Sequence, residues 1–82
     1  MKSTTQLKLE DALLNAESYI EQMKTMDDKI LSRNIDLFRE QMARAYKQGN
    51  REAYELLYEY EQQTIIARLS KLEEEIKIVG DV

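Results

Sequence analysis

The side chains of this chain that could do chemistry are its carboxylates and tyrosines, because it contains no histidine and no cysteine. The closely spaced carboxylates form two groups, Asp27, Asp28 and Asp36 and then Glu52, Glu55 and Glu59. Grouped carboxylates can exchange protons with a substrate or hold Mg²⁺ or Ca²⁺. One alternative function is therefore that of a carboxylate-based, metal-dependent enzyme.

Helical spacing gives these carboxylates a simpler interpretation. Asp27 and Asp28 suit the first turn of a helix, where the helix dipole favours anions. Glu55 and Glu59 are four residues apart, which places them together on the surface of a later helix. The serines have no histidine in the sequence to act as their base. We therefore predict that the protein is not an enzyme and has neither a metal nor an organic cofactor.

The composition indicates one small all-α domain spanning residues 1–82. The chain has no proline and only two glycines, at Gly49 and Gly80, so residues that interrupt helices are almost missing. With 43% hydrophobic residues it is too apolar for a disordered chain, and no stretch approaches the roughly 18 apolar residues of a membrane span. Without cysteine there is no disulfide framework, and we expect a cytoplasmic location.

Apolar spacing predicts three helices, at about residues 5–24, 27–48 and 51–78. Stripes of one helix face run through Leu9, Leu13, Ala16, Ile20 and Met23 and then through Leu31, Ile35, Phe38, Met42 and Ala45. The second stripe is shifted by one residue from the continuation of the first. Thr25 and Asp28 also resemble a capping box, so we predict a bend there. A chain that continued through this point would form the alternative fold, a long helical hairpin.

Gly49 and Asn50 predict a tight turn between the second and third helices. Glycine can take the left-handed conformation that ends a helix, and asparagine can cap the next one. Residues 45–57 resemble the turn of many helical hairpins, including tetratricopeptide-type repeats and the short IDEAL domain. The Ile-Asp pair of the IDEAL pattern is missing at Met42-Ala43, and no repeat of roughly 34 residues is present, so no family is assigned. The predicted fold is an antiparallel three-helix bundle.

The third helix carries two apolar stripes. The main stripe, interrupted by Glu61, consists of Tyr54, Tyr58, Ile65, Leu69, Leu72, Ile76 and Val79. A weaker stripe, centred well over 90° away, consists of Ala53, Leu56, Tyr60, Thr64 and Ala67. Because the third helix of a bundle contacts both other helices, two stripes predict two neighbours.

Helix lengths predict an uncovered end. The first two helices span about 30–35 Å and the third about 42 Å, so antiparallel packing covers the third helix only to about Leu72. The apolar residues beyond it are Ile76, Ile78, Val79 and Val82. Such a tail either frays or docks on a second copy or another protein.

The charge distribution restricts the partners. The formal net charge is −4, and residues 49–82 carry eight acidic and four basic side chains. No basic face for phosphates is visible, so we predict no nucleic-acid partner and no membrane contact. We predict a small acidic regulator, adaptor or inhibitor that acts through helix-helix contacts with a protein partner and forms a homodimer. An acidic mimic of nucleic acid that blocks a DNA-binding protein is the other alternative. The predicted contact residues are Tyr54, Leu56, Tyr60, Ile76, Ile78 and Val79.

Overall fold

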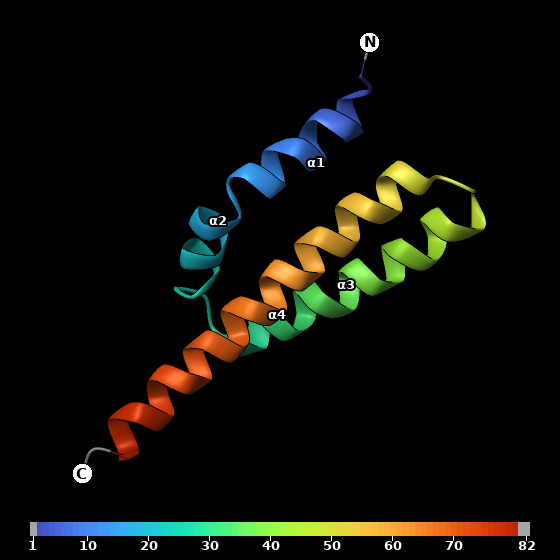
Figure 1. The fold of residues 1–82 in the computed structure, drawn as a ribbon. Coiled ribbons are helices and arrows are strands. Elements are labelled where there is room, and N and C mark those ends of the chain that lie inside the picture. The colour runs from blue at the N-terminus through green and yellow to red at the C-terminus, as the bar shows by residue number, and fades with distance from the viewer. Residues whose placement is uncertain (1, 81–82) are drawn as a thin grey trace.

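The computed structural model describes residues 2–80, with side chains as far as Lys77, and within these limits it is all-α. Its helices are α1 (Thr4–Leu14), α2 (Ala16–Met23), α3 (Asp28–Lys47) and α4 (Arg51–Gly80). Figure 1 shows α1 and α2 as one bent arm that runs in the same direction as α4, while α3 runs antiparallel to it. The all-α prediction is confirmed. The chain bends between α2 and α3, so the alternative of a long helical hairpin is wrong.

The three-helix arrangement is flattened, with α4 in the middle. The α1–α2 arm packs on one side of α4 and α3 packs on the other (Figure 1). The Cα atoms extend over 54 × 24 × 14 Å. Three helices in a triangle, at interaxial distances of roughly 8–10 Å, would give a cross-section of about 13 Å both ways. The greater width leaves one broad side of α4 without a further helix packed over it among the described residues.

Side chains cap the starts of α1 and α3, whereas α2 starts after Asn15 without a side-chain cap. Ser3 begins α1, and its Oγ accepts a hydrogen bond from the Gln6 amide at 3.1 Å. Asp27 begins α3 and accepts from the Lys29 amide at 3.1 Å. The predicted capping box at Thr25 is wrong, because the Thr25 hydroxyl instead donates to the Gln22 carbonyl at 2.7 Å. The helix α3 therefore starts after Asp27 and not after Thr25.

The first predicted helix, at about residues 5–24, is divided at Asn15. The Asn15 backbone has φ −107° and ψ 19°, outside the helical range. Its side-chain amide donates to the Asp11 carbonyl at 2.9 Å and to the Asp11 carboxylate at 2.8 Å. Asparagine offers the backbone such local alternatives to the helical hydrogen bonds. The apolar stripe continues through this break, so the spacing did not predict it.

The predicted turn at Gly49 is confirmed. Gly49 has φ +70°, in the left-handed region. The Gly49 amide donates to the Tyr46 carbonyl at 3.1 Å and the Asn50 amide to the Ala45 carbonyl at 2.9 Å, a Schellman motif. The Asn50 side chain then caps α4 by accepting from the Ala53 amide at 3.2 Å. These bonds set α3 and α4 side by side.

The core lies along both seams of α4. The predicted stripe of α3 is confirmed, with Phe38 half-buried and the other members buried; those are Leu31, Ile35, Met42 and Ala45. From α4 the buried residues include Ala67 and Thr64, and from α1 Ala12. Both α4 residues belong to the weaker of its two predicted stripes. The main stripe also borders both neighbours, since Tyr54 contacts Tyr46 of α3 and other members line grooves with α3 and α1, but most of its residues stay exposed.

Candidate interaction surface

The main apolar stripe of α4 is largely exposed over its described length. We call Tyr54, Tyr58, Ile65, Leu69, Leu72 and Ile76 the α4 stripe. Leu69, Leu72 and Ile76 are 55%, 44% and 68% exposed, and both tyrosines are exposed as well. Only Ile65 is half-buried. From Tyr54 to Ile76 the stripe is about 33 Å long.

The weaker stripe of α4 takes the core position, and three of its five residues are small. Ala53, Thr64 and Ala67 let α4 come close to neighbours on two sides, which larger side chains would prevent. The buried Thr64 hydroxyl is satisfied by the Tyr60 carbonyl at 2.7 Å. Buried Glu61, which interrupts the α4 stripe, forms an ion pair with Arg39 of α3 at 3.5 Å. Sequence hydrophobicity ranked the two stripes in the opposite order.

Gln63 joins α4 to the break in the first arm. Its side-chain amide donates to the Ala12 carbonyl at 2.9 Å and to the Glu59 carboxylate at 3.1 Å. The Ala12 carbonyl is in the last turn of α1, where carbonyls have no partner within the helix. Gln63 was not among the residues predicted from the sequence. The sequence gives one indication of its buried position, which is that Gln63 precedes Thr64 of the weaker stripe.

An aromatic cluster closes the opposite side of α4. The Tyr60 ring stacks on Phe38 of α3 with centroids 6.1 Å apart, and it meets Tyr19 of α2 edge-on at 6.4 Å. The Tyr19 hydroxyl donates to the Asp11 carboxylate at 2.8 Å. This hydrogen bond, together with desolvation and the negative charge of Asp11, raises the pKa of Tyr19. Tyr60 therefore contacts both α3 and the α1–α2 arm.

The structure places the six predicted contact residues in three different settings. Tyr54 and Ile76 lie on the α4 stripe and are exposed. Leu56 and Tyr60 are half-buried and belong to the inward-facing stripe. The side chains of Ile78 and Val79 lie outside the described residues. The exposed surface thus combines two of the predicted contacts with Tyr58, Ile65, Leu69 and Leu72.

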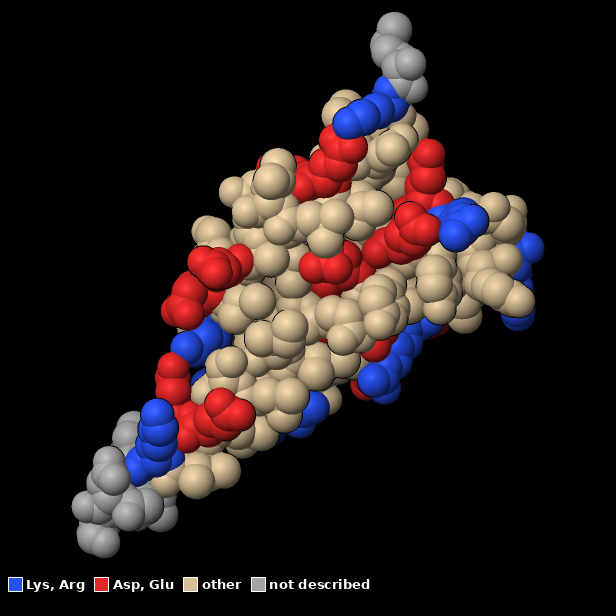
Figure 2. Space-filling model, in the orientation of Figure 1, with Lys and Arg blue, Asp and Glu red and all other residues tan. Residues whose placement is uncertain are grey.

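Two grooves flank the α4 stripe. One lies between α3 and α4 and is lined by Ser32, Ile35, Asp36, Arg39, Ile65, Arg68, Leu69 and Leu72. The other lies between α1 and α4 and is lined by Leu9, Leu13, Tyr54, Glu55, Tyr58 and Glu59. Figure 2 shows one face of the molecule over α1 and α4, where uncharged side chains cover a large area with acidic groups at intervals. A helix laid along the α4 stripe could place side chains into these grooves.

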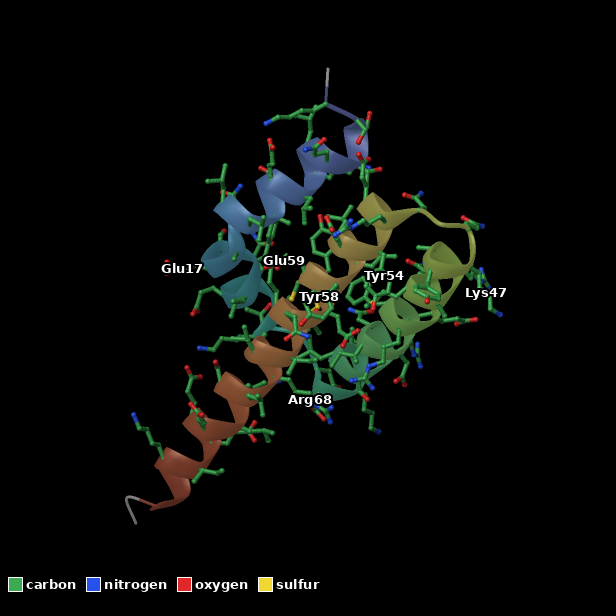
Figure 3. All side chains as sticks on the ribbon, turned by 45° about the vertical axis from the view of Figure 1, so that its right-hand side comes forward. Glu17, Lys47, Tyr54, Tyr58, Glu59 and Arg68 are labelled. Carbon is green, nitrogen blue, oxygen red and sulfur yellow. The ribbon has the colours of Figure 1, made fainter. Side chains whose placement is uncertain are left out.

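Ion pairs fasten the second half of α4 to the chain around the α2–α3 bend. Arg68, labelled in Figure 3, binds Asp28 at the start of α3. This hydrogen-bonded pair lowers the pKa of Asp28 and raises that of Arg68. Lys24 pairs with Glu74, and this hydrogen bond raises the pKa of Lys24. Beyond these anchors the end of α4 projects past the other helices (Figure 1).

The candidate carboxylates are dispersed among structural roles. Asp27 caps α3, and Glu55 pairs with Arg51 at 3.2 Å. Glu59 accepts from Gln63, and Glu52 accepts from the Ser3 hydroxyl. Over the described residues, no cluster of three or more His, Cys, Asp or Glu side chains could hold a metal ion. No helix in the same part of the chain is long and apolar enough to cross a membrane.

Comparison with known proteins gives no relative from which a function could be transferred. No protein-family model, no curated protein sequence and no solved structure matches the chain. The uncovered apolar side of α4 is therefore the feature from which a function is inferred. This apolar surface is suited to contact with another protein, and the kind of partner has to be inferred from its shape and charges.

Proposed function

We propose that this protein is a non-enzymatic interaction module whose binding surface is the α4 stripe. In this proposal it acts in the cytoplasm as a regulator, adaptor or inhibitor and associates with itself through the same surface. The observation that carries the proposal is that the larger of the two apolar stripes of α4 faces outward along about 33 Å. A contiguous apolar surface of this kind on a small protein usually marks a contact site.

The expected mode of binding is helix on helix. The residues of the α4 stripe follow spacings of three, four and, across Glu61, seven residues, which an amphipathic partner helix presents in return. Tyr54 and Ile76 act as contacts at the two ends. Leu56 and Tyr60 support the stripe from the inward side of α4. Ile78 and Val79 extend the apolar sequence beyond it.

The two alternative functions gain no support from the structure. An acidic mimic needs free carboxylates in an array, but Glu52, Glu55 and Glu61 each bind a side chain of the same molecule. A carboxylate enzyme needs its acids to converge, and the candidates are spread over different contacts. We therefore propose the interaction function alone.

Two charged substitutions on the α4 stripe test this proposal. Leu69→Asp with Ile76→Asp places carboxylates on exposed positions of α4, so the fold is retained while association is lost. The matched control is Leu7→Asp with Leu14→Asp, because these leucines are 53% and 86% exposed on the outer side of α1. Light scattering over a concentration series gives the mass, and circular dichroism gives the helix content.

The proposal predicts association for the unmodified chain and the α1 control, and a monomer of unchanged helix content for the α4 variant. An α4 variant that associates like the unmodified chain would show that the α4 stripe is not the binding surface. Equal loss of association in both variants would attribute the effect to added charge, and would also overturn the proposal.

A further inference from the structure

We infer that α4 pairs with α4 of a second copy as a parallel two-stranded coiled coil. This inference rests on the proposed function, because it names the occupant and the geometry of the α4 stripe. It is carried by the heptad spacing of exposed residues, by the width of the open side of α4 and by the charges on both edges.

The heptad pattern covers the second half of α4 and its middle. In the usual lettering of seven positions, Gln62, Leu69 and Ile76 occupy position a, and Tyr58, Ile65 and Leu72 occupy position d. Val79 is at the next d position of the sequence. A seven-residue apolar repeat is the pattern that two helices bury along a common seam. Gln62 supplies the single polar a position that fixes register in such pairs.

The open side of α4 has room for one further helix. At 100° per residue, Tyr54 and Leu72 lie at one edge of the exposed side and Ile66 lies at the other. The arc between these edges is about 120°. α3 and the α1–α2 arm contact α4 outside this arc, along the part of the helix that they cover. A single added helix fits this arc, and the α4 of a second copy presents the same seam in return.

The charges beside the seam favour a parallel pairing. The edge positions are Glu59, Ile66 and Glu73 (position e) and Glu61, Arg68 and Glu75 (position g). In a parallel pair each g residue meets the e residue five positions later in the second copy, so Arg68 meets Glu73, and symmetry gives this contact twice. The Arg68 guanidinium has five N–H donors, and Asp28 uses two of them.

An antiparallel pairing of the same seam places like charges together. When Leu69 lies opposite Ile65 of the second copy, each a residue lies opposite a d residue along the whole seam. In this arrangement g residues face g residues. Arg68 would then face Arg68 of the second copy, whereas Glu61 is buried in its ion pair with Arg39. Glu59 would face Glu73 in the same way. Like charges in contact are unfavourable across an interface, so this orientation is selected against.

The parallel pairing also covers Ile66, an exposed apolar residue outside the α4 stripe. Ile66 of the second copy falls opposite Glu61, at the level where α3 lies beside α4. It would lie over the groove that Ile35, Asp36 and Ile65 line between those helices. The groove and the exposed isoleucine thus complement each other in a symmetric dimer.

Disulfide trapping tests the orientation, because the natural chain has no cysteine. A Gln62→Cys variant places two thiols in one layer of a parallel pair, within the Cα separation that a disulfide needs. Mild oxidation is expected to give a disulfide-linked dimer on a non-reducing gel. A Ser18→Cys variant, on an exposed site of α2, is the control and is expected to stay largely monomeric.

An antiparallel pair would give the opposite result. Gln62 would then face Leu72 of the second copy. A mixture of Gln62→Cys and Leu72→Cys chains would crosslink, and Gln62→Cys alone would not. That result would overturn the parallel pairing while leaving self-association through the α4 stripe intact. A chain that stays monomeric at every concentration would overturn self-association itself.

A charge reversal provides an independent test. Glu73→Lys turns two attractive contacts with Arg68 into repulsive ones, and we expect about a tenfold rise in the dimer dissociation constant at low salt. Glu17→Lys makes the same charge change on α2, away from the seam (Figure 3). Sedimentation equilibrium measures both variants. Equal dissociation constants for the two variants would contradict the Arg68–Glu73 contact.

Discussion

Arg68 donates two hydrogen bonds to the Asp28 carboxylate, at 2.7 Å from Nε and 3.2 Å from the second guanidinium nitrogen. This bidentate contact joins the middle of α4 to the first turn of α3. It holds α3 against one edge of α4 at the level of Leu69 and Leu72, and so helps to leave the α4 stripe open. The pair lies at the surface, so its effect depends on pH and salt.

The Asp28–Arg68 pair is expected to stabilise the fold above the ordinary pKa of an aspartate, about 4. The pKa of Asp28 is lower in the folded protein than in the unfolded chain. As the pH falls, the Asp28 carboxylate is therefore protonated in the unfolded chain before it is protonated in the folded protein. The stabilisation is therefore lost as the pH falls through the lowered pKa. Thermal melts of the unmodified chain and Asp28→Asn should differ at pH 7 and converge in strong acid. A difference in melting temperature that stays constant down to pH 2.5 would contradict the pair.

Replacing Gly49 tests the turn between α3 and α4. Gly49→Ala places a side chain at φ +70°, which costs about 1–2 kcal/mol of folding stability. No atom lies within 4 Å of the added carbon, so the cost comes from the backbone alone. Gly49→Asn, which tolerates this conformation better, should lose less. Urea denaturation gives both values, and equal losses for alanine and asparagine would contradict the backbone explanation.

Gln63→Glu tests the contact between α4 and the end of α1. The substitution keeps the shape but removes the donor to the Ala12 carbonyl and adds a buried charge beside Glu59. We expect the free energy of unfolding to fall by about 2–4 kcal/mol at neutral pH, because the buried Ala12 carbonyl and the half-buried Glu59 carboxylate lose their donor. Acid should restore part of this loss by protonating the new carboxylate. A urea midpoint at pH 7 equal to that of the unmodified chain would show that this bond contributes nothing.

The helices and the Gly49 turn could be predicted because local rules determine them. The stripe of α3 has one neighbour and one buried face, so its spacing alone identifies Leu31 and Ile35 as core. At Gly49 the sequence offers few alternatives to a helix end. The break at Asn15 was not predicted, since it comes from a side chain competing with the backbone inside a continuous apolar stripe.

The position of the exposed apolar surface could be predicted only in part. Hydrophobicity ranks Leu69 and Ile76 above Ala67 and Thr64, but close packing of α4 between two neighbours favours the small residues. The large residues of the α4 stripe are left largely exposed. Tyr60 was predicted as a contact, and its ring is held between Phe38 and Tyr19, which no local pattern indicates.

The mass of the unmodified chain in solution is the most direct test of the central claim, that the α4 stripe binds a second copy. Sedimentation equilibrium should be run over a wide range of concentrations at low salt. We predict a mass of two chains at high concentration that falls towards one chain on dilution. A mass of one chain at every concentration would contradict the claim.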